Sequence, residues 1–122
     1  LKGKGAIITD DTRIRRSMPT IEYLVSKGAI VAIASHLGRP KSGPEDKFSL
    51  APCAERMTEL LPGDASVTFV SDCVGDAVSE AVGSASEGSV IMLENTRFYK
   101  EETKNDAAFV EKLAMPFDLF VN

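Results

Sequence analysis

The chain has 122 residues, of which 43% are hydrophobic and 26% charged, proportions typical of one ordinary globular domain with a single core. Fourteen basic residues against eighteen acidic ones give a net charge of −4, so the chain lacks the positive field of a nucleic-acid-binding protein. No apolar run approaches the ~20 residues of a membrane-spanning helix, and the spacing of the two cysteines does not match a zinc site.

Apolar residues recur along the chain in two patterns, short continuous runs and stripes at three- and four-residue steps. The short runs predict buried strands, and the stripes predict helices that each turn one face to a core. In chain order the predicted elements are a helix from Thr12 to Gly28, a strand at 30–34, a helix at 49–61, a strand at 67–70, a helix at 74–82, a strand at 90–93, a helix at 105–115 and a strand at 118–121. The apolar stretch at 6–8 is too short to assign as a strand.

Short polar residues and helix breakers mark the ends of the predicted helices. The cluster at 10–12, Ser49 and the pair at 105–106 are predicted N-caps, whereas Gly83 and Pro116 are predicted stops. Continuous apolar strands that alternate with helices indicate a parallel sheet covered on both faces. The sequence therefore predicts an α/β fold: one domain with a three-layer, Rossmann-like parallel sheet and helices on both faces.

Cationic side chains follow two of the predicted strands. His36 and Arg39 leave the strand at 30–34, and Arg97 leaves the strand at 90–93. Arg13 lies at the start of the first helix, where the free N–H groups and the helix dipole favour an anion. Because the carboxyl ends of parallel strands share one edge, these residues could converge on a small, multiply charged ligand. Solvated surface arginines and a structural histidine remain the alternative interpretation.

Other chemistries match the sequence less well. Gly38 and Gly43 have the interval of a phosphate-binding loop, but Pro44 and Glu45 stand where Lys and Ser or Thr are required. The glycines near the amino terminus follow no strand, which argues against a dinucleotide-binding fingerprint. The chain has a single histidine and no GxSxG nucleophile elbow. We therefore expect neither a cofactor nor a metal ion on this chain.

Six segments of the chain carry a more specific signal. They read ITDDTRIR at 8–15, MPTI at 18–21, ASHLGRP at 34–40, FSLAP at 48–52, DCVG at 72–75 and LENTRF at 93–98. In order and spacing they resemble the amino-terminal domain of the phosphoglycerate kinase family. The resemblance covers essentially the whole chain, and the run from Ser35 to Pro40 is its most specific part.

The resemblance implies a glycolytic enzyme that transfers a phosphoryl group between 1,3-bisphosphoglycerate and ADP, with Mg-ATP or Mg-ADP as co-substrate. Residues 1–122 would be a partial amino-terminal substrate-binding domain, and the co-substrate would be held by a carboxyl-terminal nucleotide-binding domain outside these residues. By motif, Arg13 would be catalytic, contacting the substrate and stabilising the phosphoryl group in transfer. His36, Arg39 and Arg97 would bind 3-phosphoglycerate or 1,3-bisphosphoglycerate and clamp the 3-phosphate.

The family pattern also extends beyond both ends of this sequence. It includes a strand just before Leu1 and a further substrate arginine after Asn122, so we expect a sheet incomplete at both chain ends. A polypeptide of these residues alone is expected to be inactive, and unstable or self-associated. The complete enzyme is expected to be a cytoplasmic monomer, or a plastid protein if a transit peptide preceded Leu1, without nucleic-acid or membrane partners. The competing hypothesis is a non-catalytic α/β module that binds a phosphorylated metabolite or a protein.

Overall fold

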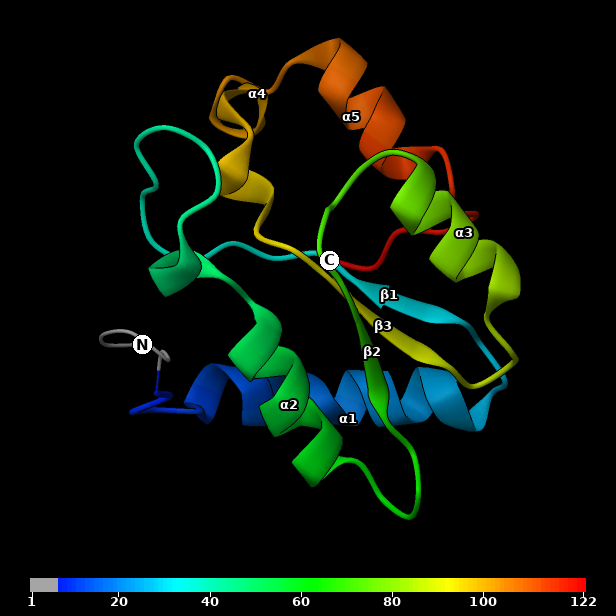
Figure 1. The fold of residues 1–122 in the computed structure, drawn as a ribbon. Helices are drawn as coiled ribbons and strands as arrows, with labels where there is room; N and C mark the ends of the chain where they lie inside the picture. The colour runs from blue at the N-terminus through cyan, green and yellow to red at the C-terminus, as the bar shows by residue number, and fades with distance from the viewer. Residues whose placement is uncertain (1–6) are drawn as a thin grey trace.

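The computed structural model describes residues 7–122 and contains a sheet of three parallel strands (Figure 1). The strands are β1 (Val31–Ile33), β2 (Val67–Val70) and β3 (Val90–Leu93), and their spatial order is β1-β3-β2. Val90 of β3 is in register with Val31 on one side and Val67 on the other. The central strand β3 is buried along its whole length, as predicted for a continuous apolar run.

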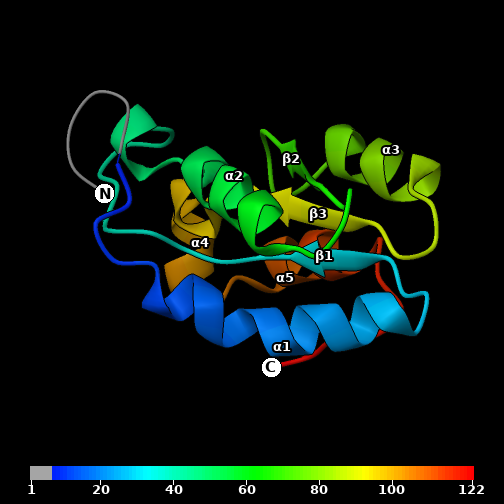
Figure 2. The ribbon, with the colours of Figure 1, turned by 90° about the horizontal axis from the view of Figure 1, so that it is seen from below.

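Helices cover both faces of this sheet, which Figure 2 shows from a second direction. Helices α1 (Thr12–Ser26) and α2 (Ala51–Leu60) pack on one face, against Val90 and Met92 of β3. Helices α3 (Asp76–Ser84) and α5 (Ala107–Ala114) pack on the other, where Ile91 and Leu93 point. Side chains alternate along a strand, so β3 supplies both layers of the core. The predicted three-layer α/β architecture is confirmed.

The predicted cap of α5 is present, and the N-cap of α1 is Asp11, within the predicted cluster, although its side chain forms no cap hydrogen bond. Oδ1 of Asp10 accepts hydrogen bonds from the backbone N of Thr12 at 2.9 Å and from its Oγ1 at 2.6 Å, where α1 begins. Oδ1 of Asp106 accepts a bond from the backbone N of Phe109 at 3.0 Å and caps α5. These side chains supply acceptors to N–H groups that have no partner within the helix.

Several predicted boundaries are wrong by one to a few residues. Strand β1 covers only 31–33, because its pairing with β3 extends over only those positions. The N-cap of α2 is Leu50, although Oγ of Ser49 accepts a 3.2 Å bond from the N of Ala51. Helix α3 begins at Asp76 and includes Gly83 rather than ending there.

The segment between β3 and α5 contains two short elements, although the sequence predicts no helix or strand between residues 93 and 105. It contains a 3₁₀ turn, η2 (Thr96–Phe98), and a short helix, α4 (Lys100–Thr103). A second 3₁₀ turn, η1 (Asp46–Phe48), closes the long loop that follows β1. These short elements hold the backbone of both loops that leave the carboxyl edge of the sheet.

The predicted last strand at 118–121 is wrong. These residues have no strand assignment, and the side chains of Leu119 and Phe120 are 89% and 87% exposed. A strand needs a neighbour for its N–H and C=O groups, and no described strand pairs with this segment. Of the unassigned stretch at 6–8, Ala6 lies outside the described residues, and Ile7 forms only a single bridge. Among the described helices, none has the length and apolarity to cross a membrane.

Candidate functional site

The loops after β1 and β3 meet at the carboxyl edge of the sheet through the side chain of Asn95, which is fully buried. Its Nδ2 donates hydrogen bonds to the carbonyl oxygen of Leu37 at 2.7 Å and to that of Phe48 at 2.9 Å. Its Oδ1 accepts a bond from the backbone N of Arg97 at 3.0 Å. One amide therefore contacts both ends of the loop that carries Arg39 and the backbone of Arg97.

Residues on either side of Asn95 add hydrogen bonds between the loop after β3 and the loop after β1. The backbone N and Oγ1 of Thr96 both donate to the carbonyl oxygen of Ser35 at 3.1 Å. The carboxylate of Glu94 accepts bonds from the backbone N of Leu50 at 2.8 Å, from Oγ of Ser49 at 2.7 Å and from the N of Asn95 at 2.8 Å. Glu94 therefore places a negative charge at the amino end of α2, where the helix dipole favours one.

The guanidinium of Arg97 points from the loop after β3 toward the loop after β1. Its Nη1 donates a 3.1 Å hydrogen bond to the carbonyl oxygen of Gly38, and its Nε lies 3.6 Å from Oε2 of Glu102. This Nε is buried and has no hydrogen-bond partner among the described residues. A buried N–H without a partner is costly, so an acceptor arriving beside Arg97 would be favoured.

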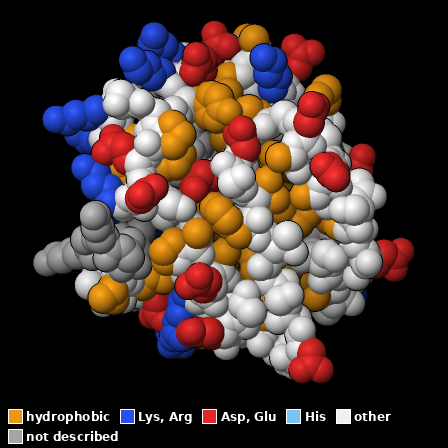
Figure 3. Space-filling model, viewed as in Figure 1, with side chains coloured by type: hydrophobic (Ala, Val, Ile, Leu, Met, Phe, Trp, Pro, Cys, Tyr) orange, Lys and Arg blue, Asp and Glu red, His pale blue; other side chains and the backbone are white. Residues whose placement is uncertain are grey.

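Arg39 and Arg97 line the same cavity, whose volume is about 280 Å³. The other lining residues are Pro40, Tyr99, Lys100 and Thr103. Lysine and arginine side chains gather, with acidic ones between them, on the side of the molecule that carries α4 and the loop after β1 (upper left in Figure 3). Three cationic side chains around one cavity favour an anionic ligand, and guanidinium groups can bind phosphate or carboxylate through paired N–H donors.

The other two predicted site residues do not line this cavity. His36 is exposed in the loop after β1, between Ser35 and Leu37, whose carbonyl oxygens are held from the β3 side. Arg13 is exposed on the first turn of α1 and forms no ion pair with the described residues. Their roles therefore stay predictions.

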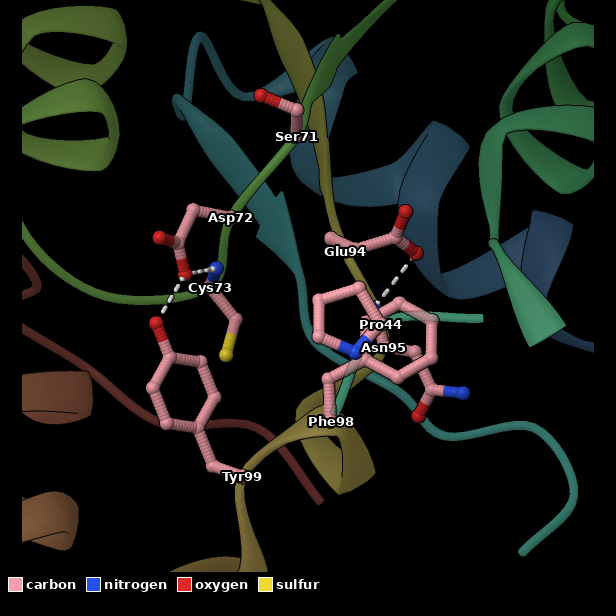
Figure 4. A pocket seen from close by; sticks show the side chains of 8 residues that line it. All are labelled: Pro44, Ser71, Asp72, Cys73, Glu94, Asn95, Phe98 and Tyr99. Atoms are coloured by element: carbon pink, nitrogen blue, oxygen red, sulfur yellow. Dashed lines mark hydrogen bonds between the residues drawn. The ribbon is translucent and has the colours of Figure 1, made fainter. Parts of the chain in front are cut away.

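A second cavity, of about 200 Å³, lies where β2 and β3 end (Figure 4). It is lined by Pro44, Ser71, Asp72, Cys73, Glu94, Asn95, Phe98 and Tyr99. In it, Oη of Tyr99 donates a 2.8 Å bond to Oδ1 of Asp72, which also accepts a 2.7 Å bond from the N of Cys73. The sequence motifs by themselves predict no role for Asp72, Glu94 or Asn95. Their position directly after apolar strands, where ligands bind in such sheets, was the available signal.

Titration in the second cavity argues against nucleophilic chemistry there. Burial, and then the nearby Asp72 carboxylate, raise the pKa of Cys73 to about 12. Burial and the hydrogen bond to Asp72 likewise raise the pKa of Tyr99 to about 12. The thiol is therefore protonated at neutral pH, and it packs in the apolar cluster beside α3. Cys53 is partly buried and packs as a small hydrophobe against the apolar cluster that contains residues of α1 and α2.

No group of three or more His, Cys, Asp or Glu side chains is arranged to hold a metal ion within residues 7–122. The polar atoms at the carboxyl edge instead bond to backbone groups of neighbouring loops, as the contacts of Asn95 and Glu94 illustrate. The cavity that Arg39, Arg97 and Lys100 line is the candidate site, because it brings three cationic side chains together.

Comparison with known proteins gives consistent results. The family model described as phosphoglycerate kinase matches residues 1–122. The chain is 53% identical over all its length to a chloroplastic phosphoglycerate kinase of Volvox carteri, and 55% identical over 115 residues to a cytosolic one of Triticum aestivum. It covers 26% and 28% of these two proteins, so it spans about a quarter of the length of the curated relatives it matches. A crystal structure of phosphoglycerate kinase from Pyrococcus horikoshii superimposes with a TM-score of 0.80 at 33% identity, over 96% of this chain and 30% of that one.

Proposed function

The chain belongs to the phosphoglycerate kinase family, and we propose that it supplies part of the substrate site for phosphoryl transfer between 1,3-bisphosphoglycerate and ADP. In this proposal residues 1–122 belong to an amino-terminal substrate-binding domain that holds 3-phosphoglycerate or 1,3-bisphosphoglycerate. The relatives bear the enzyme's name, but the chain covers about a quarter of their length. The reaction of the whole protein is therefore part of the proposal.

The observation that carries the proposal is the cavity lined by Arg39, Arg97 and Lys100. A three-carbon acid phosphate is small and multiply charged, and its phosphate offers several acceptor oxygens to guanidinium donors. Arg97, which lines this cavity, carries such a guanidinium group. We assign the clamp on the 3-phosphate to Arg39 and Arg97. His36, which is on the same loop but does not line the cavity, stays a predicted substrate contact.

Phosphoryl transfer requires little covalent chemistry from the protein, which acts by positioning the reactants and stabilising the spread charge. The phosphate clamp would fix the substrate and direct its carboxyl end away from the anchored phosphate. Arg13, on the first turn of α1, would then meet the transferring phosphoryl group. The partial positive charge at the start of the helix would add to that of its guanidinium.

The nucleotide is the second reactant, and the sequence lacks a phosphate-binding-loop motif for it. The loop containing Gly38 and Gly43 lacks the Lys and the Ser or Thr of a phosphate-binding loop. We therefore assign Mg-ATP and Mg-ADP to a separate nucleotide-binding domain and derive no step that uses them. For the whole protein we propose a monomer without nucleic-acid or membrane partners. Its compartment stays open between cytoplasm and plastid, since the relatives include both cytosolic and chloroplastic proteins.

Titration calorimetry with 3-phosphoglycerate, on the protein at its natural full length, tests the proposal. Removing one charged hydrogen-bonding group from a phosphate site costs about 1.5–3 kcal/mol, so Arg39→Ala should weaken binding by roughly 10- to 100-fold. Lys112→Ala, which removes an exposed charge from α5, is the control and should bind like the wild type. Equal affinity of Arg39→Ala and the wild type would refute the site. A wild type that binds no 3-phosphoglycerate would favour the non-catalytic module.

A further inference from the structure

We propose that Asn95 is a positioning residue that sets the distance between Arg39 and Arg97. The proposal rests on the proposed function, because it assumes that these two guanidinium groups clamp one phosphate. Asn95 does not line the cavity that Arg39 and Arg97 share. It would act through the two arginines, by fixing the backbone on which each of them stands.

Asn95 holds the loop after β1 at two points. Leu37, two residues before Arg39, and Phe48, at the end of η1, both offer their carbonyl oxygens to Nδ2 of Asn95. Between these points the hydrogen bonds are local, such as that from the N of Lys41 to Oε1 of Glu45 at 2.8 Å. Among the described residues, the only hydrogen bonds between residues 37–48 and the rest of the fold are those of Asn95 and Arg97 and a local bond from the N of Ser49 to the O of Asp46. The side-chain amide of Asn95 thus fixes both ends of this loop to the loop after β3.

The same side chain also fixes Arg97. Oδ1 of Asn95 accepts a hydrogen bond from the backbone N of Arg97 and so sets the first turn of η2. This orientation brings Nη1 of Arg97 to the carbonyl oxygen of Gly38, the residue before Arg39. Three bonds from one buried amide therefore determine how far apart the two guanidinium groups lie.

The chemistry of the amide makes the proposal specific. An amide offers two donors and an acceptor at once, which the two carbonyl oxygens and the N–H around Asn95 require. A carboxylate of the same shape has no donor and would face the carbonyl oxygens of Leu37 and Phe48 with a second oxygen. Asn95→Asp therefore breaks the two bonds to the loop while keeping the side-chain volume and the bond to Arg97.

The test compares Asn95→Asp with a control in the protein at its natural full length. The control is Thr58→Ala, because Oγ1 of Thr58 also links two elements, with a bond to the O of Ala54 and another from the N of Val67, both at 3.0 Å. Hydrogen exchange of residues 37–48 measures how often the loop opens. Titration calorimetry measures 3-phosphoglycerate affinity.

We expect Asn95→Asp to speed exchange in residues 37–48 and to weaken 3-phosphoglycerate binding, each by about tenfold or more. Thr58→Ala should lower the melting temperature but leave both readouts as in the wild type. In a double variant, Asn95→Asp added to Arg39→Ala should cost less affinity than it costs in the wild type, because only its effect on Arg97 remains. A merely structural role would make the two losses additive.

The outcomes separate the two proposals. A folded Asn95→Asp protein with unchanged loop exchange and affinity, or with losses additive to those of Arg39→Ala, overturns the positioning role. A wild type that binds no 3-phosphoglycerate refutes the proposed function, and loop exchange then decides by itself whether Asn95 holds the loop. If Asn95→Asp does not fold, Asn95→Ser, which also lacks the amide donors but adds no charge, is measured in the same way.

Discussion

A Cβ atom added to Gly38 would lie 2.6 Å from Cδ1 of Phe48, so the ring of Phe48 occupies the space of a side chain at position 38. Gly38 also has a φ of +66°, which residues with a Cβ rarely adopt. The two residues close the loop that carries Arg39, with Gly38 at its start and Phe48 in η1. This close approach explains why the backbone needs glycine directly before Arg39.

Gly38→Ala is therefore expected to destabilise the protein more than Gly43→Ala in the same loop. Gly43 also has a positive φ, of +92°, but nothing lies within 4 Å of an added Cβ, so its replacement costs only the backbone strain of about 1–2 kcal/mol. Gly38→Ala adds a clash with the ring of Phe48. Urea unfolding of both variants measures the difference. An equal loss of unfolding free energy in the two variants would contradict this prediction, because it would show that the ring of Phe48 moves aside at little cost.

Glu94 is predicted to stabilise the folded protein, because its carboxylate is buried and accepts three hydrogen bonds. Glu94→Ala would leave the N of Leu50 without an acceptor and should lower the free energy of unfolding by about 3 kcal/mol. Glu55→Ala, at an exposed position of α2, is the matched control and should change it by less than about 0.5 kcal/mol. Denaturant unfolding followed by circular dichroism decides, and a small loss at Glu94 would contradict the prediction.

The contact between α1 and α2 should depend on pH through Asp11. Hydrogen bonds from Arg56 on α2 and from Arg15 lower the pKa of Asp11 below its ordinary value of 3.8. Because the folded-state pKa is the lower one, the ionised carboxylate stabilises the fold above about pH 4, and this contribution is lost as pH falls through the folded-state pKa.

Asp11→Asn is therefore expected to flatten the acid side of the stability curve. Thermal melting of the wild type and the variant between about pH 5 and pH 2.5 measures this, and their melting temperatures should converge toward acid. Asp64→Asn, in the turn after α2, controls for the loss of one surface carboxylate. A constant difference between the wild type and Asp11→Asn at all pH values would exclude the linkage.

The carboxyl-terminal apolar run should make a polypeptide of these 122 residues self-associate. Leu119, Phe120 and Val121 are 89%, 87% and 61% exposed, and adjacent exposed apolar side chains favour association. Replacing Leu119 and Phe120 together with Lys should give a monomer in sedimentation velocity at about 100 μM. The same two charges placed at the exposed positions Ala107 and Ala108 of α5 form the control and should not prevent association. A monomeric wild type at that concentration would contradict the prediction.

The apolar pattern was sufficient to predict most of the fold. Strands β2 and β3 have the predicted bounds, and α1 begins at Thr12 as its cap cluster indicates. The apolar pattern did not predict strands correctly where strand formation depends on pairing with a neighbouring strand. Residues 118–121 are apolar enough for a strand but have no strand beside them, and β1 is only as long as its pairing with β3.

The candidate site divides in the same way. By itself, the sequence determined that Arg39 and Arg97 follow parallel strands, and the common edge of the sheet brings them to one cavity. Only the tertiary structure decided that Asn95 joins the two loops. Its hydrogen bonds join residues that are 58 and 47 positions apart in the sequence. Contacts at such separations produce no periodic pattern of apolar residues from which they could be predicted. Periodicity reports which face of an element is buried, whereas a buried amide finds its partners only when the chain has folded around it.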